Sequence, residues 1–196
     1  MASVIARYRC CRRFLGVALA LLCLPLLLSP GARAENDAQS AVALEKQVKA
    51  AFLYKFMAYV EWPAGRAADG PLKIGVIGAD EVAHELMRLV RLRGSQDRPV
   101  TVHRLRPTEA PTGLHALFIG GGYGQSPEPL LRQAQQESVL TVTENEQAFA
   151  HGSVINFKLL DGRVRFDISL PAAQRHNLRL SSRLIAVAHE VHRREP

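Results

Sequence analysis

The sequence predicts an α/β fold: a layered, mainly parallel sheet flanked by helices, with a C-terminal β-hairpin and a terminal helix. Two observations lead to this prediction. Short runs of strand-forming apolar residues alternate with segments whose apolar residues recur at helical spacing, which is typical of parallel strands joined by helices. Near the C-terminus, apolar and polar residues alternate on both sides of Asp161-Gly162, a dipeptide favoured in two-residue hairpin turns.

The first 34 residues have the features of a secretory signal peptide. Several arginines precede an apolar stretch from Phe14 to Leu28, and Ala32-Arg33-Ala34 supplies an A-x-A cleavage pattern. We therefore expect cleavage after Ala34 and a single exported domain over residues 35–196. Pro25 and the short apolar stretch argue against an uncleaved anchor, because a membrane span needs about 20 apolar residues.

This leader carries most of the net positive charge. The chain has 25 Lys and Arg against 18 Asp and Glu, a net charge of +7, and three cysteines. Five basic residues, no acidic residue and all three cysteines fall in residues 1–34, so residues 35–196 hold 20 basic and 18 acidic residues and no cysteine. Leu22, rather than a small residue, precedes Cys23, so a lipoprotein is not predicted. The domain must rely on a hydrophobic core instead of disulfides, and its charge is too small for bulk nucleic-acid binding.

The first predicted element of the domain is a long helix. Residues 35–40 are polar and are expected to be loosely structured. From Gln39 to Trp62, apolar residues recur at spacings of three and four, which indicates a helix with one buried face. Pro63 ends the helix, because the residue before a proline avoids the helical region.

Strands and helical segments then alternate. The predicted strands cover residues 72–78, 98–105, 114–119 and 139–142. Asp80 is the predicted N-cap of a helix over 81–91. Ser126-Pro127-Glu128 resembles the start of a helix that continues to Gln136, and a short helical turn is predicted at 146–150.

A two-residue turn fixes the register of the hairpin over residues 153–170. The register pairs apolar residues on one face: Leu159 with Val164, Phe157 with Phe166, and Ile155 with Ile168. It pairs polar residues on the opposite face: Lys158 with Arg165, and Asn156 with Asp167. After the hairpin, residues 171–178 are predicted to form a turn or short helix, and 181–191 an amphipathic terminal helix capped by Ser181.

No group of residues in the domain has the pattern of a catalytic site. The glycines from Gly120 to Gly124 lack the spacing of a nucleotide-binding loop and are interpreted as a tight turn. His189 and His192 lie three residues apart on the predicted terminal helix, but no third ligand has metal-binding spacing. We therefore predict no catalytic residue, no cofactor and no metal.

Two features could form a surface for a partner or ligand. Lys158 and Arg165 are like charges opposite each other, with Arg163 nearby. This arrangement is mildly destabilising unless the cations pair with acids such as Asp167 or with an anionic partner, although a solvated face is the simpler interpretation. Trp62 is the only tryptophan, and it either fills the core or belongs to a binding surface.

The order of several segments resembles the YfiR family of periplasmic proteins, over nearly all of residues 46–190. The matching segments are 48–56 (VKAAFLYKF), 59–63 (YVEWP), the strand 72–77, 139–142 with Phe149-Ala150, 163–168 with Ala172-Ala173, and Leu178 with 181–184. Each segment alone is a weak signal, whereas the combination is specific.

The resemblance implies a non-enzymatic periplasmic regulator with an α/β fold that tends to form a homodimer. The best-known family member restrains YfiN, an inner-membrane diguanylate cyclase, by contact with its periplasmic part, and is sequestered by YfiB, an outer-membrane lipoprotein. The outcome is control of cyclic di-GMP and hence of biofilm formation. Two departures are the absence of cysteines after residue 34 and a Gly-rich segment where the family usually has a Ser-Glu pair, so neither redox control nor a site at that segment is implied here.

The leading hypothesis is therefore a periplasmic inhibitor of a membrane signalling enzyme of the diguanylate cyclase type, with a YfiN-like partner, a YfiB-like partner and no nucleic acid. Its candidate surface residues are Trp62, Lys158, Arg163, Arg165, Asp167, Arg175 and Asn177. The alternative is a periplasmic small-ligand-binding protein that holds an anionic or aromatic metabolite between the helix end at Trp62 and the turn at Arg175.

Overall fold

The computed structural model describes residues 31–66, 70–93 and 98–194, with side chains from Ala38 onward. The predicted leader up to residue 30 lies outside the described residues, so its cleavage stays a prediction. The chain divides into two compact units, residues 1–40 and 41–196, and the sheets belong to the second. None of the described helices is long and apolar enough to cross a membrane.

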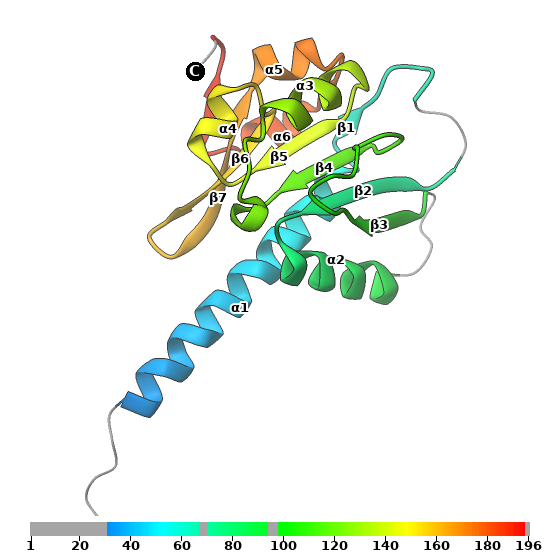
Figure 1. Ribbon diagram of the computed structural model, residues 1–196. Coiled ribbons are helices and arrows are strands. Elements are labelled where there is room, and N and C mark those ends of the chain that lie inside the picture. Colours follow the sequence, from blue (N-terminus) through cyan, green and yellow to red (C-terminus); the bar gives the residue numbers. More distant parts are fainter. Residues whose placement is uncertain (1–30, 67–69, 94–97, 195–196) are drawn as a thin grey trace, which may run out of the picture. The chain divides into compact units, whose positions relative to one another are not determined.

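A seven-stranded sheet organises the second unit (Figure 1). Its strands follow the order β3-β2-β4-β5-β6-β7-β9. Their bounds are β2 (Leu72–Ile77), β3 (Val100–Arg104), β4 (Ala116–Ile119), β5 (Leu140–Thr143), β6 (Ile155–Leu160), β7 (Arg163–Ser169) and β9 (Glu190–His192). Every neighbouring pair is parallel except the β6–β7 hairpin, which confirms the predicted mainly parallel α/β fold.

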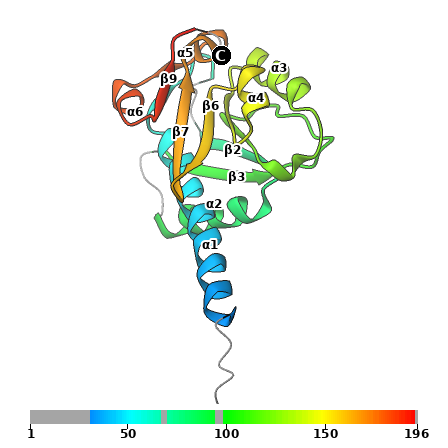
Figure 2. The same cartoon turned by 90° about the vertical axis from the view of Figure 1, so that its left-hand side faces the viewer.

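Helices cover both faces of this sheet (Figure 2). They are α1 (Gly31–Phe56), α2 (Asp80–Arg93), the 3₁₀ turn η1 (Gly121–Tyr123), α3 (Glu128–Gln136), α4 (Glu146–Ala150), α5 (Leu170–Arg175) and α6 (Ser182–Ala186). Ile74 and Val76 of β2 pack in one core cluster with α1 and α2, whereas Ile77 packs in a second cluster with α3. This follows from strand geometry, because successive side chains point to opposite faces.

Aromatic rings join α1 to the hairpin. Phe56 is 1% exposed, and its ring centroid lies 5.1 Å from that of Phe166 and 5.9 Å from those of Phe52 and Phe157. The alternation of the hairpin explains the contact, since Phe157 and Phe166 are directly paired and share one face. The register predicted from the sequence is confirmed at every pair.

Two predicted helix ends are wrong. The first helix begins at Gly31 and ends at Phe56 instead of running from Gln39 to Trp62. Val60–Glu61 then forms β1, which pairs antiparallel with β8 (Arg179–Leu180). This pairing buries Val60 in the core and satisfies backbone groups that a helix would otherwise have used.

The terminal helix is shorter than predicted. Ser181 caps α6 as expected, accepting a hydrogen bond from Leu184 N at 3.3 Å, but the helix ends at Ala186 and the chain forms β9. The edge of β7 offers a row of backbone groups: His189 N donates to Phe166 O at 2.8 Å, and Glu190 pairs with Asp167. Backbone pairing at this edge outweighs a continuing amphipathic pattern.

The Gly-rich segment after β4 is explained by a close approach of two loops. Gly122 N donates to Gly78 O at 3.0 Å, and Gly120 N donates to Ile77 O at 2.9 Å. A Cβ at Gly78 would lie 2.3 Å from Tyr123 N, and the Gly78 φ is +68°. Glycine is therefore required at Gly78 both for space and for its left-handed backbone.

We expect Gly78→Ala to lower the free energy of unfolding by at least about 2 kcal/mol, because the left-handed backbone and the overlap with Tyr123 each carry a cost. Urea denaturation measures the effect. The matched control is Gly65→Ala, since a Cβ at Gly65 meets nothing within 4 Å. Equal stability of the two variants would contradict this account of the turn.

Candidate functional site

The end of the β6–β7 hairpin carries two exposed arginines and extends beyond the neighbouring strands (Figure 1). Asp161 and Gly162 form its turn with φ values of 49° and 69°, as a type I′ turn requires. Arg163 and Arg165 are exposed, and neither forms an ion pair with another residue in the described part of the chain. The hairpin end therefore presents two cations whose charge is not neutralised locally.

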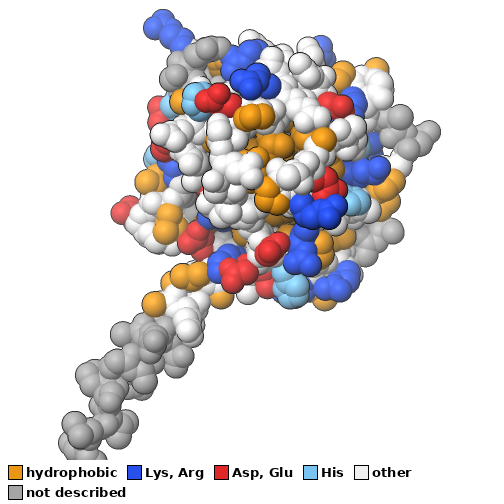
Figure 3. Space-filling view, viewed as in Figure 1, with side chains coloured by type: hydrophobic (Ala, Val, Ile, Leu, Met, Phe, Trp, Pro, Cys, Tyr) orange, Lys and Arg blue, Asp and Glu red, His pale blue; other side chains and the backbone are white. Residues whose placement is uncertain are grey.

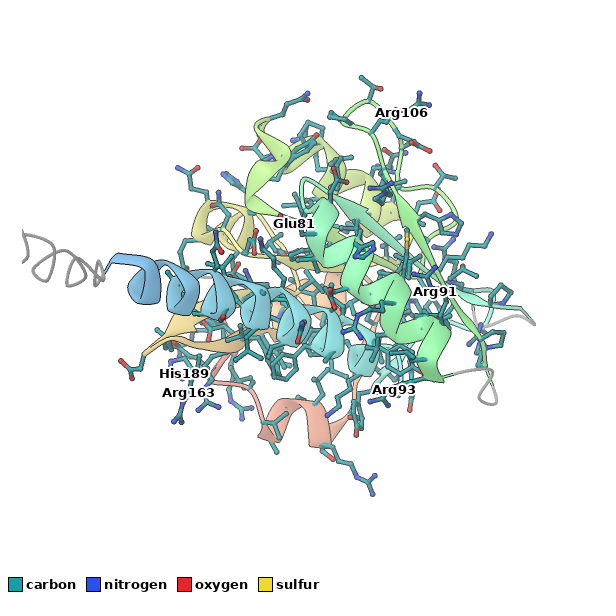
Figure 4. The ribbon with its side chains drawn as sticks, turned by 90° about the horizontal axis from the view of Figure 1, so that it is seen from below. Glu81, Arg91, Arg93, Arg106, Arg163 and His189 are labelled. Atoms are coloured by element: carbon teal, nitrogen blue, oxygen red, sulfur yellow. The ribbon has the colours of Figure 1, made fainter. Side chains whose placement is uncertain are left out.

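A hollow of about 440 Å³ lies beside these cations, lined by Leu160, Asp161, Arg163, Arg165 and His189. Arg163 and His189 lie next to each other in Figure 4. The two segments that border it also hold exposed apolar side chains: Val187 at 65% and, on the opposite face of the hairpin from Arg165, Leu159 at 56%. We call these seven residues, which cover both faces of the hairpin end, the hairpin surface. Exposed apolar groups together with exposed charge are the composition of a protein-binding surface.

A buried ion pair supports the base of the hairpin surface. Lys158 lies opposite Arg165, but its Nζ turns to Asp167 Oδ2 at 2.6 Å and to Glu146 Oε1 at 3.2 Å. The Asp167 contact is the main cause that raises the pKa of Lys158. Of the two opposed cations, Lys158 thus pairs with internal acids, and Arg165 is the one left facing solvent.

The structure separates the predicted surface residues into three groups. Trp62 and Asp167 are 8% and 0% exposed, and Trp62 Nε1 donates to His115 O at 2.9 Å, so neither side chain presents a surface. Arg163 and Arg165 come together on the hairpin surface with Lys158 beneath them. Half-buried Arg175 is the last residue of α5, and exposed Asn177 follows that helix. α5 begins where β7 ends, at the other end of that strand from the hairpin turn.

Comparison with known protein families assigns the chain. The family model described as YfiR/HmsC-like matches residues 46–189, which is more than half of the sequence and includes the hairpin surface. The chain belongs to the YfiR/HmsC-like family. This is a family of periplasmic, non-catalytic regulators associated with diguanylate cyclase signalling. No curated protein matches the chain significantly.

Five of the seven members of the hairpin surface in this YfiR/HmsC-like chain are not among the surface candidates from the sequence: Leu159, Leu160, Asp161, Val187 and His189. The register already places Leu159 near the turn, so its exposure could have been inferred. Val187 and His189 were predicted on a helix, and their place beside the hairpin depends on β9, which pairs with β7. A three-residue edge strand carries no periodic signal of its own.

A second hollow lies where ligands commonly bind in α/β sheets, at the carboxyl ends of the strands where the strand order reverses. It measures about 450 Å³. Its lining comes from α1, the turn after β2, the start of α2 and the residue after β5: Glu45, Lys46, Lys49, Gly78, Ala79, Asp80, Glu81, Val82 and Glu144. Glu144 Oε1 accepts from Gly121 N at 2.6 Å, and Glu144 Oε2 lies 2.5 Å from Lys49 Nζ.

The Glu144 carboxylate therefore already accepts the hydrogen bond from the Gly121 backbone N–H that a bound phosphate would need. Four acids and two lysines line this hollow, which makes it unsuited to an anionic ligand. Charges of both signs are also interspersed over the face seen in Figure 3. The hairpin surface, where two arginines and one acid line the hollow, is thus the better candidate for this YfiR/HmsC-like chain.

Two histidines make stability depend on pH. Burial is the first cause that lowers the pKa values of His115 and His176 from 6.5. His176 is 1% exposed, and its Nδ1 lies 2.7 Å from Val139 O. As the pH falls, the two imidazoles therefore take up protons in the unfolded chain before they do so in the folded protein. Their contribution to the free energy of unfolding is present above pH 6.5 and is lost as the pH falls below it.

We expect the free energy of unfolding in urea to be lower at pH 5.5 than at pH 7.5. His176 accounts for at most about 1.4 kcal/mol of the difference, and the half-exposed His115 for less. Higher stability at pH 5.5 would show that the two imidazoles are protonated in the folded protein.

Proposed function

We propose that this chain is a non-enzymatic periplasmic regulator that inhibits an inner-membrane diguanylate cyclase by direct contact through the hairpin surface. Inhibition lowers cyclic di-GMP and therefore reduces biofilm formation. The observation that carries the proposal is the combination of family membership over residues 46–189 with the exposed cations Arg163 and Arg165 and the exposed apolar Leu159 and Val187 of the hairpin surface.

The chemistry of this surface selects the kind of partner. Two arginines against the single acid Asp161 leave a net positive charge, which attracts an acidic surface and speeds its docking. The apolar side chains supply area that becomes buried on contact. The partner surface should therefore be acidic with an apolar centre, on the periplasmic part of a membrane protein. A homodimer and an outer-membrane lipoprotein of the YfiB type are the further contacts that we propose on the family resemblance.

We expect deletion of this gene to raise cyclic di-GMP and surface attachment. Complementation with the full chain should restore both to the parental level. Complementation with a chain starting at Met followed by residues 35–196 should not, because the regulator would stay in the cytoplasm. Measurement of cyclic di-GMP in extracts provides the test, and unchanged levels in the deletion strain would contradict the proposal.

A further inference from the structure

β9 lies beside β7 (Figure 2). Three side chains with metal-binding atoms from these two strands converge. Asp167 belongs to β7, and Glu190 and His192 belong to β9. One ligand atom from each lies within 4.8 Å of the other two. His192 Nε2 is 4.0 Å from Asp167 Oδ2 and 3.7 Å from Glu190 Oε2. Residues 190 and 192 point to the same face of β9 because side chains alternate along a strand.

Two buried polar atoms here lack the hydrogen-bond partners that such atoms normally have. Asp167 is 0% exposed. Its Oδ2 is paired with the Lys158 ammonium at 2.6 Å, whereas its Oδ1 has no hydrogen-bond partner among the described residues. His192 Nε2 is also buried without a hydrogen bond in the described part of the chain.

The charges around this point do not balance. Lys158 contributes one positive charge, whereas Asp167, Glu146 and Glu190 contribute three negative charges. These four side chains together carry an excess of two negative charges. Arg165 belongs to the same strand as Asp167, but it is exposed and forms no ion pair with any described acid. A divalent cation would neutralise the excess.

We propose that Asp167, Glu190 and His192 bind a divalent transition-metal ion, with Zn²⁺ the best match to one imidazole nitrogen and two carboxylate oxygens. Ligand atoms around a tetrahedral zinc lie about 3.4 Å apart for bonds of about 2.1 Å. The observed 3.7 Å and 4.0 Å require only small side-chain rotations. The His192 ring is already held edge-on by Phe149 at 5.1 Å.

The ion would fasten β9 to β7 and so fix the segment that carries Val187 and His189. Glu190 and His192 follow the last residue of the family match, His189. Two of the three proposed ligands therefore lie outside the matched range, and the proposal does not depend on the proposed regulatory function.

Isothermal titration calorimetry of the purified protein with Zn²⁺ tests the proposal. We expect one ion per chain and a Tm higher by about 5 °C or more at a hundredfold excess over Kd. His192→Ala should weaken binding at least tenfold. Glu190→Gln should also weaken it, and this variant is expected to fold because Glu190 is exposed. Ca²⁺, which prefers oxygen ligands, should bind more weakly than Zn²⁺.

His189→Ala is the matched control, because this exposed histidine lies on the same segment but outside the ligand set. It should bind Zn²⁺ as the unaltered protein does. The proposal is overturned if no Zn²⁺ binds, or if His192→Ala and Glu190→Gln both bind Zn²⁺ as tightly as His189→Ala does. That second outcome would place the ion at a different histidine.

Discussion

The double substitution Arg163→Glu and Arg165→Glu is expected to abolish inhibition, raising cyclic di-GMP to the level of the deletion strain. Both side chains are exposed and form no ion pair with described residues, so the change removes no internal contact. Position 165 faces Lys158, and a carboxylate there would be attracted to the ammonium. Opposite an acidic partner, however, two reversed charges turn attraction into repulsion, which weakens binding by about 100-fold or more.

The matched control is Arg91→Glu with Arg93→Glu on α2, which changes the net charge by the same amount. Figure 4 shows these arginines away from Arg163 and His189. The control variant loses the contact of Arg93 with the Tyr54 ring, but it should repress cyclic di-GMP as the unaltered chain does. Equal repression by both double variants would mean that the hairpin surface is not the contact.

Phe56→Ala is expected to lower the free energy of unfolding by about 3–5 kcal/mol, the largest stability effect that the core predicts. Phe56 is 1% exposed and contacts three other rings from α1 and the hairpin. Its removal leaves a cavity between helix and sheet that rigid strands cannot close. Urea denaturation monitored by circular dichroism gives the value.

The control is Leu92→Ala, since Leu92 is 72% exposed. It should change stability by less than about 0.5 kcal/mol. A Phe56→Ala variant as stable as the Leu92→Ala variant would show that α1 does not pack on the hairpin through this ring.

The hairpin could be predicted from the sequence because its information is local. Asp161-Gly162 fixes the turn, the turn fixes the register, and the register pairs apolar residues on one face. The arginines of the hairpin surface were found for the same reason, since Arg163 and Arg165 immediately follow the turn.

The parts that could not be predicted depend on contacts distant in sequence. β1 pairs with β8, and β9 pairs with β7, but two or three residues carry no periodic pattern that distinguishes a strand from the end of a helix. The burial of Trp62 and Asp167 depends on these pairings and on neighbouring loops. The sequence alone does not show this burial, and it therefore places both residues among the surface candidates. His192 was considered only beside His189 on a helix, whereas its contacts with Asp167 arise from β9.

Covalent capture of the partner tests the central claim most directly. A photocrosslinking amino acid at Leu159, on the hairpin surface, is compared in living cells with the same amino acid at Leu92 on α2, which is the more exposed of the two at 72% against 56%. We expect position 159 to crosslink to a membrane protein that carries a diguanylate cyclase domain, and position 92 to give little or none of that product. No such product from position 159, or equal yields from both positions, would contradict inhibition by contact through the hairpin surface.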